Sequence, residues 1–119
     1  MKLMIVDDSM VIRRKIERVH QLPVEKVVQA ENGHEAVAVC RRELPDVVTM
    51  DLTMPHMDGV ECVKRLVEIK PDIRVLVISA LADKHTAIQA IKNGARGFLC
   101  KPFSEDALNG ALQKLLAGN

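Results

Sequence analysis

The sequence predicts an α/β protein in which one five-stranded parallel sheet is covered by helices on both faces. Five short runs rich in apolar residues alternate along the chain with five longer stretches that have helical periodicity. The runs expected at the centre of the sheet are apolar throughout, which is typical of parallel strands buried on both faces. No linker, low-complexity tract or change of composition interrupts the 119 residues. We therefore expect one domain over residues 1–119, without an output domain.

The predicted strands lie at residues 3–6, 26–30, 47–50, 73–78 and 97–100. Each precedes a helix whose apolar residues recur on one face, and that face should pack against the sheet. In chain order these residues are Ile12, Ile16 and Val19; Ala36, Val37, Cys40 and Leu44; Val60, Val63 and Val67; Ala87, Ile88, Ile91 and Ala95; Leu108, Ala111, Leu112 and Leu115. Ser104 should cap the last helix, and Gly94 should end the fourth.

Composition excludes several classes of function. The net charge is +1, and 48% of residues are hydrophobic, as in a compact soluble protein rather than a disordered or nucleic-acid-coating one. The basic group at Arg13, Arg14, Lys15 and Arg18 is interpreted as a solvated helix face. No apolar stretch approaches the roughly 20 residues that span a bilayer, and no signal peptide is evident. We therefore expect a cytoplasmic protein without nucleic-acid or membrane partners.

The cysteines and histidines predict no metal site of their own. Three cysteines, Cys40, Cys62 and Cys100, are widely spaced among apolar neighbours, where free Cys usually behaves as a small core hydrophobe. The four histidines are scattered, and we expect them at the surface.

Acidic residues follow two of the predicted strands. Asp7 and Asp8 end the first apolar run, and Asp51 ends the third. If these strands are neighbours at the point where the winding of the sheet reverses, the three carboxylates converge at its carboxyl edge. Such a cluster repels itself unless a divalent cation occupies it. Each acid alone has an ordinary alternative role near a helix N-terminus.

Two further strands end in residues that suit phosphoryl chemistry. Ser79 follows the fourth strand and Lys101 the fifth, adding a hydroxyl and an ammonium to the same edge. Asp51 could then accept a phosphoryl group, with Mg²⁺ held by Asp8 and Asp51 to neutralise charge. It is the conjunction of these residues at four strand ends that favours this interpretation.

These residues resemble the receiver domain of two-component response regulators, specifically the single-domain chemotaxis type. The likeness covers essentially the whole chain and implies the flavodoxin-like strand order 2-1-3-4-5 of that family. The motifs that carry it are Asp7-Asp8-Ser9, Asp51-x-x-Met54-Pro55-x-Met57-Asp58-Gly59, Ser79-Ala80 and Gly97-Phe98-Leu99-Cys100-Lys101-Pro102-Phe103.

The resemblance implies a role for each site residue. Asp51 is the phosphoacceptor. Mg²⁺, with Mn²⁺ as a substitute, is bound by Asp8 and Asp51, by Asp7 mainly through water, and by the backbone carbonyl of Thr53. Ser79 and Lys101 bind the phosphoryl oxygens. The Lys101-Pro102 bond is expected to be cis.

The resemblance also implies a conformational switch. Ser79 moves toward the phosphoryl group, Phe98 swings inward behind it, and the face of the fourth helix, fifth strand and fifth helix changes. We expect that face to include Lys84, Ala87, Ala90 and Phe98. Phe98 stands where many members carry Tyr. Thr53 and Leu81 occupy the positions that help set phosphoryl lifetime, and neither side chain can orient an attacking water strongly.

A histidine kinase is the expected phosphodonor, and the target is a protein that binds the switched face, such as the flagellar motor switch. A phosphatase is a further expected partner, and the chain should be monomeric. The alternatives are a phosphate sink or relay intermediate, or an aspartyl-nucleophile phosphohydrolase. The last is disfavoured, because residue 53 is Thr where that class has a second Asp and 119 residues leave little room for a cap. We thus expect a receiver that promotes its own phosphorylation and dephosphorylation rather than an enzyme.

Overall fold

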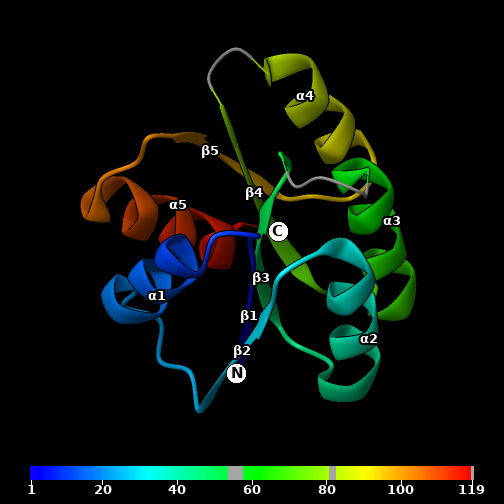
Figure 1. The fold of residues 1–119 in the computed structure, drawn as a ribbon, viewed down its shortest axis with the longest axis horizontal. Helices are drawn as coiled ribbons and strands as arrows, with labels where there is room; N and C mark the ends of the chain where they lie inside the picture. The colour runs from blue at the N-terminus through cyan, green and yellow to red at the C-terminus, as the bar shows by residue number, and fades with distance from the viewer. Residues whose placement is uncertain (54–57, 81–82, 119) are drawn as a thin grey trace.

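The computed structural model describes residues 1–53, 58–80 and 83–118, in which five parallel strands form one sheet between two layers of helices (Figure 1). The elements are β1 (Lys2–Val6), α1 (Met10–Val19), β2 (Lys26–Ala30), α2 (Gly33–Glu43), β3 (Val47–Asp51), α3 (Gly59–Ile69), β4 (Arg74–Ala80), α4 (Lys84–Lys92), β5 (Gly97–Lys101) and α5 (Glu105–Ala117). None of the helices within these ranges is long and apolar enough to cross a membrane.

The strand order is β2-β1-β3-β4-β5, which confirms the predicted fold class and winding. The chain starts at β1, passes to β2 at one edge and then returns to β3 on the other side of β1. Val6 at the end of β1 therefore lies in register with Ala30 of β2 and Met50 of β3. The reversal of winding places the carboxyl ends of β1 and β3 side by side, where sheets of this kind bind ligands.

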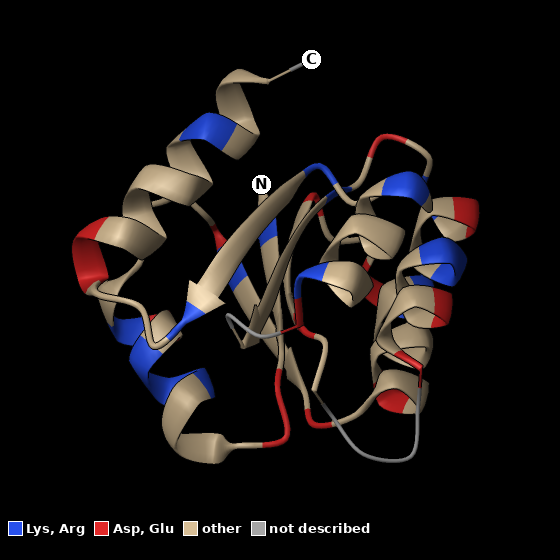
Figure 2. Cartoon of the chain, turned by 90° about the horizontal axis from the view of Figure 1, so that it is seen from above, with Lys and Arg blue, Asp and Glu red and all other residues tan. Residues whose placement is uncertain are grey.

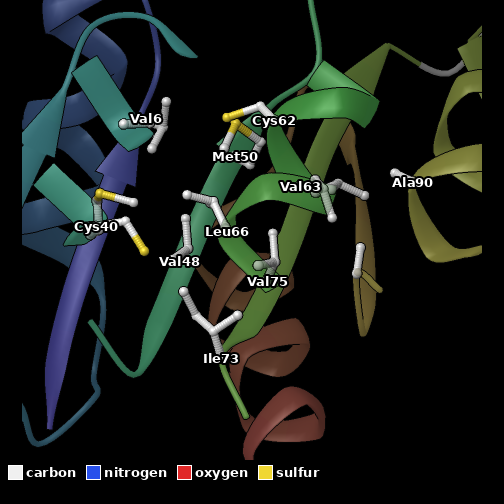
Figure 3. Close-up of a cluster of buried hydrophobic side chains, with 14 of the residues drawn as sticks. Val6, Cys40, Val48, Met50, Cys62, Val63, Leu66, Ile73, Val75 and Ala90 are labelled. Atoms are coloured by element: carbon white, nitrogen blue, oxygen red, sulfur yellow. The ribbon is translucent and has the colours of Figure 1, made fainter. Parts of the chain in front are cut away.

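Each face of the sheet has its own hydrophobic cluster. Residues of α2, α3 and α4 pack on one face and residues of α1 and α5 on the other, as Figure 1 shows. In the first cluster Val48, Met50 and Leu66 lie fully buried between β3 and α3 (Figure 3). In the second, Ile16 of α1 and Leu108 of α5 are buried against the sheet. The double covering explains why residues 3–6 of β1 and all of residues 47–50 of β3 except Thr49 are apolar.

The prediction was wrong for part of the α2 and α4 faces. Leu44, expected in the core, is 50% exposed, because it forms the C-cap of α2 in a left-handed conformation (φ 49°). In α4, Ile88 and Ile91 are exposed, whereas Ala87 and Ala90 are buried. The helix thus packs through its small side chains, and the two alanines expected on the partner face belong to the core instead.

The helix boundaries follow the predicted caps. The Ser104 hydroxyl accepts a hydrogen bond from the Ala107 amide at 3.0 Å, so it caps α5 as expected. Gly94 follows the C-cap of α4 with φ 116°, a conformation that other residues rarely adopt. A Cβ atom at this position would also lie 2.7 Å from Val67 Cγ2, so both backbone and space require glycine here.

The prediction that the cysteines are core residues is right for two of them and wrong for Cys100. Cys40 and Cys62 are buried, whereas Cys100 is only partly buried. Burial raises the pKa of the Cys62 thiol to about 12. Cys62 should therefore behave as an inert core residue.

A buried asparagine on α5 ties this helix to the end of α1. The Asn109 side-chain amide donates to the Val19 carbonyl at 3.0 Å and to the Glu105 carbonyl at 3.1 Å. Its carbonyl oxygen accepts from the Gln21 amide at 2.9 Å. One side chain thus satisfies backbone groups that follow α1 and have no helical partner.

We predict that Asn109→Ala lowers the free energy of unfolding by about 1–3 kcal/mol, because it leaves the Val19 carbonyl and the Gln21 amide without their partner. Urea unfolding followed by far-ultraviolet circular dichroism measures the change. Gln113→Ala, an exposed substitution on the same helix, is the control and should stay within about 0.5 kcal/mol of the parent. Equal stability of the two variants would contradict the assigned role of Asn109.

Candidate functional site

The sheet brings the three predicted acids together. Asp7 directly follows β1, and its amide donates to the Ala30 carbonyl at 3.1 Å, continuing the β1–β2 ladder. Asp51 is the last residue of β3 and pairs with Ile78 of β4. Asp7, Asp8 and Asp51 each offer a carboxylate oxygen, and these oxygens lie within 4.8 Å of one another. Asp7 and Asp51 are buried, whereas Asp8 is exposed, so the cluster opens to solvent on one side.

Hydrogen bonds hold one oxygen of each buried carboxylate, whereas the other oxygen has no hydrogen-bond partner among the described residues. Asp7 Oδ1 accepts from the Ser9 amide at 2.8 Å. Asp51 Oδ1 accepts from the Thr53 amide at 2.9 Å and from the Thr53 hydroxyl at 2.7 Å. Within the described residues, Oδ2 of Asp7 and Oδ2 of Asp51 are buried without a hydrogen-bond partner. Buried acceptors of this kind are rare, and these two oxygens are free to bind a cation.

Lys101 supplies one positive charge to the cluster. Its Nζ lies 3.2 Å from Asp51 Oδ2 and 3.8 Å from Asp7 Oδ2. The lysine ends β5 and is followed by a cis peptide bond to Pro102, the isomer that the family resemblance implied. One ammonium faces three carboxylates, so most of the negative charge remains. An all-oxygen donor set with excess negative charge fits a hard divalent cation such as Mg²⁺.

The pKa of Asp7 is raised by its position in the buried acidic cluster. This pKa is raised from 3.8 to about 6, mainly by burial, and the charge of Asp51 acts in the same direction. The hydrogen bond from the Ser9 amide and the charge of Lys101 act in the opposite direction. The raised pKa means that the protein around Asp7 stabilises its negative charge less well than water does.

The two predicted switch residues lie on β4 and β5. Ser79 is fully buried one residue after Ile78, the partner of Asp51, and its hydroxyl donates to the Ala80 carbonyl at 3.4 Å. Phe98 is half-buried and pairs with Val77. The ring lines a shallow apolar groove of about 220 Å³ between β5 and α4, whose other lining residues are Lys84, Ala87, Ile88 and Ile91.

The interpretation of the basic group on α1 was only partly right. Figure 2 shows basic residues along this helix, and Arg14 and Arg18 are exposed as expected. Arg13, however, is half-buried and donates from Nη1 to the Asp7 carbonyl at 2.6 Å. Lys15 donates to the Phe103 carbonyl at 3.2 Å and lies 4.9 Å above the centre of that ring. Helical spacing could have indicated the position of Arg13, since it lies three residues before the buried Ile16.

Several residues of the predicted motifs lie outside the described part of the chain. These are Met54, Pro55, His56 and Met57 in the loop after β3, and Leu81 after β4. The expected role of Leu81 in phosphoryl lifetime therefore has no structural account. Thr53 is described and exposed, and its contacts with Asp51 come from its amide and hydroxyl, while the role expected for its carbonyl stays a prediction.

Comparison with known proteins agrees with this geometry. Residues 3–113 match the family described as the response regulator receiver domain. The chemotaxis protein CheY of Listeria monocytogenes is 42% identical over 115 residues, covering 96% of this chain and 97% of that protein. Among solved structures, Vibrio cholerae chemotaxis protein CheY4 aligns with a TM-score of 0.85 at 30% identity, covering 96% of this chain and 97% of that one.

A second solved structure has the same fold. A response regulator from Burkholderia pseudomallei, solved with a phosphorylated aspartic acid and a calcium ion, aligns with a TM-score of 0.79 at 30% identity. The alignment covers 98% of this chain and 69% of that one. The fold, the acidic cluster and these likenesses lead to one conclusion: the chain belongs to the response regulator receiver domain family, whose members are signalling proteins and not classical enzymes.

Proposed function

We propose that this chain is a phosphorylation-activated response regulator that accepts a phosphoryl group from a histidine kinase on Asp51 and acts in chemotaxis or motility. One observation carries the assignment of Asp51. Its Oδ2 is buried, has no hydrogen-bond partner among the described residues and lies 3.2 Å from Lys101 Nζ. Because no hydrogen bond from the described residues occupies this oxygen, it is available to bond to phosphorus. The ammonium of Lys101 lies next to it and can offset negative charge.

The chemistry follows from the positions of the side chains. A carboxylate oxygen of Asp51 forms a bond to phosphorus while the phosphorus–nitrogen bond of a phosphohistidine breaks, and the electron pair of that bond leaves with the imidazole. Lys101 offsets charge on the phosphoryl oxygens, and the Ser79 hydroxyl can turn from the Ala80 carbonyl to donate to one of them. Mg²⁺, bound by Asp7, Asp8, Asp51 and the Thr53 carbonyl, would supply further neutralisation of the transferred group.

The output surface is the face formed by α4, β5 and α5. A few charge-assisted hydrogen bonds to the phosphoryl group, about 1.5–3 kcal/mol each, are enough to shift a two-state balance tens- to hundreds-fold. Phe98 lies at the groove beside α4, so movement of Ser79 toward the site and of this ring would change the groove. Exposed Ile88 and Ile91, with Lys84 at the rim, are the side chains that a protein partner would meet there.

The first prediction of this proposal is that Asp51→Asn abolishes phosphorylation by acetyl phosphate in Mg²⁺, because no other carboxylate has the same access to Lys101. Intact-protein mass spectrometry should find one added phosphoryl group on the parent chain and none on the variant. Asp58→Asn is the matched control, because Asn can replace Asp58 as the N-cap of α3, and this variant should be labelled normally. Labelling of Asp51→Asn, or of the parent in excess chelator, would refute the assignment.

A second prediction concerns the switch. Adding beryllofluoride and Mg²⁺, which together mimic a phosphoryl group, should shift backbone amide resonances of Phe98 and of α4 as well as those at the strand ends. Two-dimensional nuclear magnetic resonance spectra measure this, and Asp51→Asn with the same additions should show no shift at Phe98. Changes confined to the ends of β1 and β3 would contradict an output through α4 and β5.

A third prediction uses the pKa of Asp7. Since this pKa rises from 3.8 in a model carboxyl to about 6 in the fold, the folded chain binds more protons than the unfolded chain between these values. Without divalent cations, the contribution of Asp7 to the free energy of unfolding should therefore be greatest below pH 4 and fall by about 1–3 kcal/mol as the pH rises to 6.

Urea unfolding of the parent and Asp7→Asn in chelator, at several pH values, measures this contribution as the difference between the two curves. Mg²⁺ should bind more tightly as the pH rises through 6, because a proton on Asp7 competes with the cation. Stability curves that run parallel from pH 4 to 7 would show that Asp7 does not titrate in this way.

A further inference from the structure

The peptide unit that joins Asp7 to Asp8 is held by a guanidinium group. Arg13, one turn into α1, donates from Nη1 to the Asp7 carbonyl at 2.6 Å. Because a peptide bond is planar, the Asp7 carbonyl and the Asp8 amide share one rigid unit. A hydrogen bond to this carbonyl therefore restrains the plane that contains the Cα atoms of both acidic residues.

Arg13 is itself oriented by the neighbouring strand. Its Nε donates to Oε1 of Gln29 on β2 at 3.0 Å, and the Gln29 amide nitrogen donates in turn to Glu17 on α1. The guanidinium is a rigid planar fork, so two bonds from different nitrogens determine its orientation. The group is also half-buried, which limits competition from water.

The hydrogen bond from Arg13 is the third one that restrains Asp7. The Asp7 amide is bound to the Ala30 carbonyl, and Asp7 Oδ1 is bound to the Ser9 amide. With the carbonyl on Arg13, Oδ2 is the one polar atom of Asp7 left for a ligand among the described contacts. Arg13 forms no ion pair with a carboxylate of the described residues, so its direct contact with the acidic pair is through the Asp7 backbone.

Such bracing has a physical purpose in a cluster of like charges. Mg²⁺ requires near-octahedral geometry, and mutual repulsion would otherwise let the exposed Asp8 turn away from Asp7 and Asp51. We propose that Arg13, braced by Gln29, is a positioning residue that pre-organises the Asp7–Asp8 pair for a divalent cation. This inference rests on the proposed cation site and adds a residue that acts on it through the backbone.

The test compares Mg²⁺ affinity in Arg13→Ala, Arg13→Lys, Gln29→Leu and the parent by isothermal titration calorimetry. Arg14→Ala is the matched control, since it removes the same charge from an exposed neighbour that makes no described hydrogen bond. Removing a positive charge near a cation site should by itself tighten binding. Weaker binding by Arg13→Ala therefore has the opposite sign to a charge effect and reports geometry.

We expect Arg13→Ala to bind Mg²⁺ at least about tenfold more weakly than the parent, as for other partners that orient metal ligands. Arg13→Lys should restore part of the affinity, because an ammonium can reach the carbonyl but cannot reproduce the fork. Gln29→Leu should lose about threefold, and Arg14→Ala should stay within twofold of the parent. In the acetyl phosphate reaction, Arg13→Ala should need more Mg²⁺ for half-maximal rate while approaching the parent rate at saturation.

Urea unfolding of each variant separates positioning from general destabilisation. If Arg13→Ala does not fold, Arg13→Lys and Gln29→Leu decide the matter by the same affinity measurement. Equal Mg²⁺ affinity of the folded Arg13 and Gln29 variants and the parent would overturn the inference and leave the proposed function intact. Failure of the parent chain to bind Mg²⁺ would overturn both.

Discussion

The main constraint on this structure is that negatively charged carboxylates must lie together, largely buried, at the ends of two strands. The raised pKa of Asp7, from 3.8 to about 6, corresponds to a cost on the order of 3 kcal/mol for the charged form. Burying one large apolar side chain contributes about 1.5–3 kcal/mol. Leu3, Met4 and Ile5 of β1 are completely buried, so this strand alone can offset the cost. Burial of the apolar centre of the sheet therefore offsets the free-energy cost of the charged carboxylates at its edge.

Sequence patterns could predict the sheet and the acidic cluster because both follow from short-range features. Apolar runs define the strands, and the residue after each run is placed at the carboxyl edge by the parallel winding. Asp7, Asp51 and Lys101 were found in this way, and the structure brings them together. The helix caps at Ser104 and Gly94 could also be predicted from the sequence, because a cap depends on a few consecutive residues.

The features that the sequence could not reveal are contacts between distant elements. Helical spacing can place Arg13 on the inner side of α1, but its contact with Gln29 on β2 joins two elements and has no local signal in the sequence. The α4 face was misjudged because periodicity marks a wide apolar stripe without saying which part meets the sheet. Close packing selected Ala87 rather than Ile88 for the interior, which reverses the order that hydrophobicity alone would suggest.

The alanine contact has a consequence for the local stability of α4. An alanine that leaves water buries far less apolar area than a leucine or valine, so Ala87 and Ala90 anchor this helix less firmly than Leu66 and Val63 anchor α3. Local opening of α4 should then require less free energy than opening of α3, and its amides should exchange hydrogen sooner. A loosely anchored helix can be repositioned by a modest change at the sheet without disturbing the rest of the core.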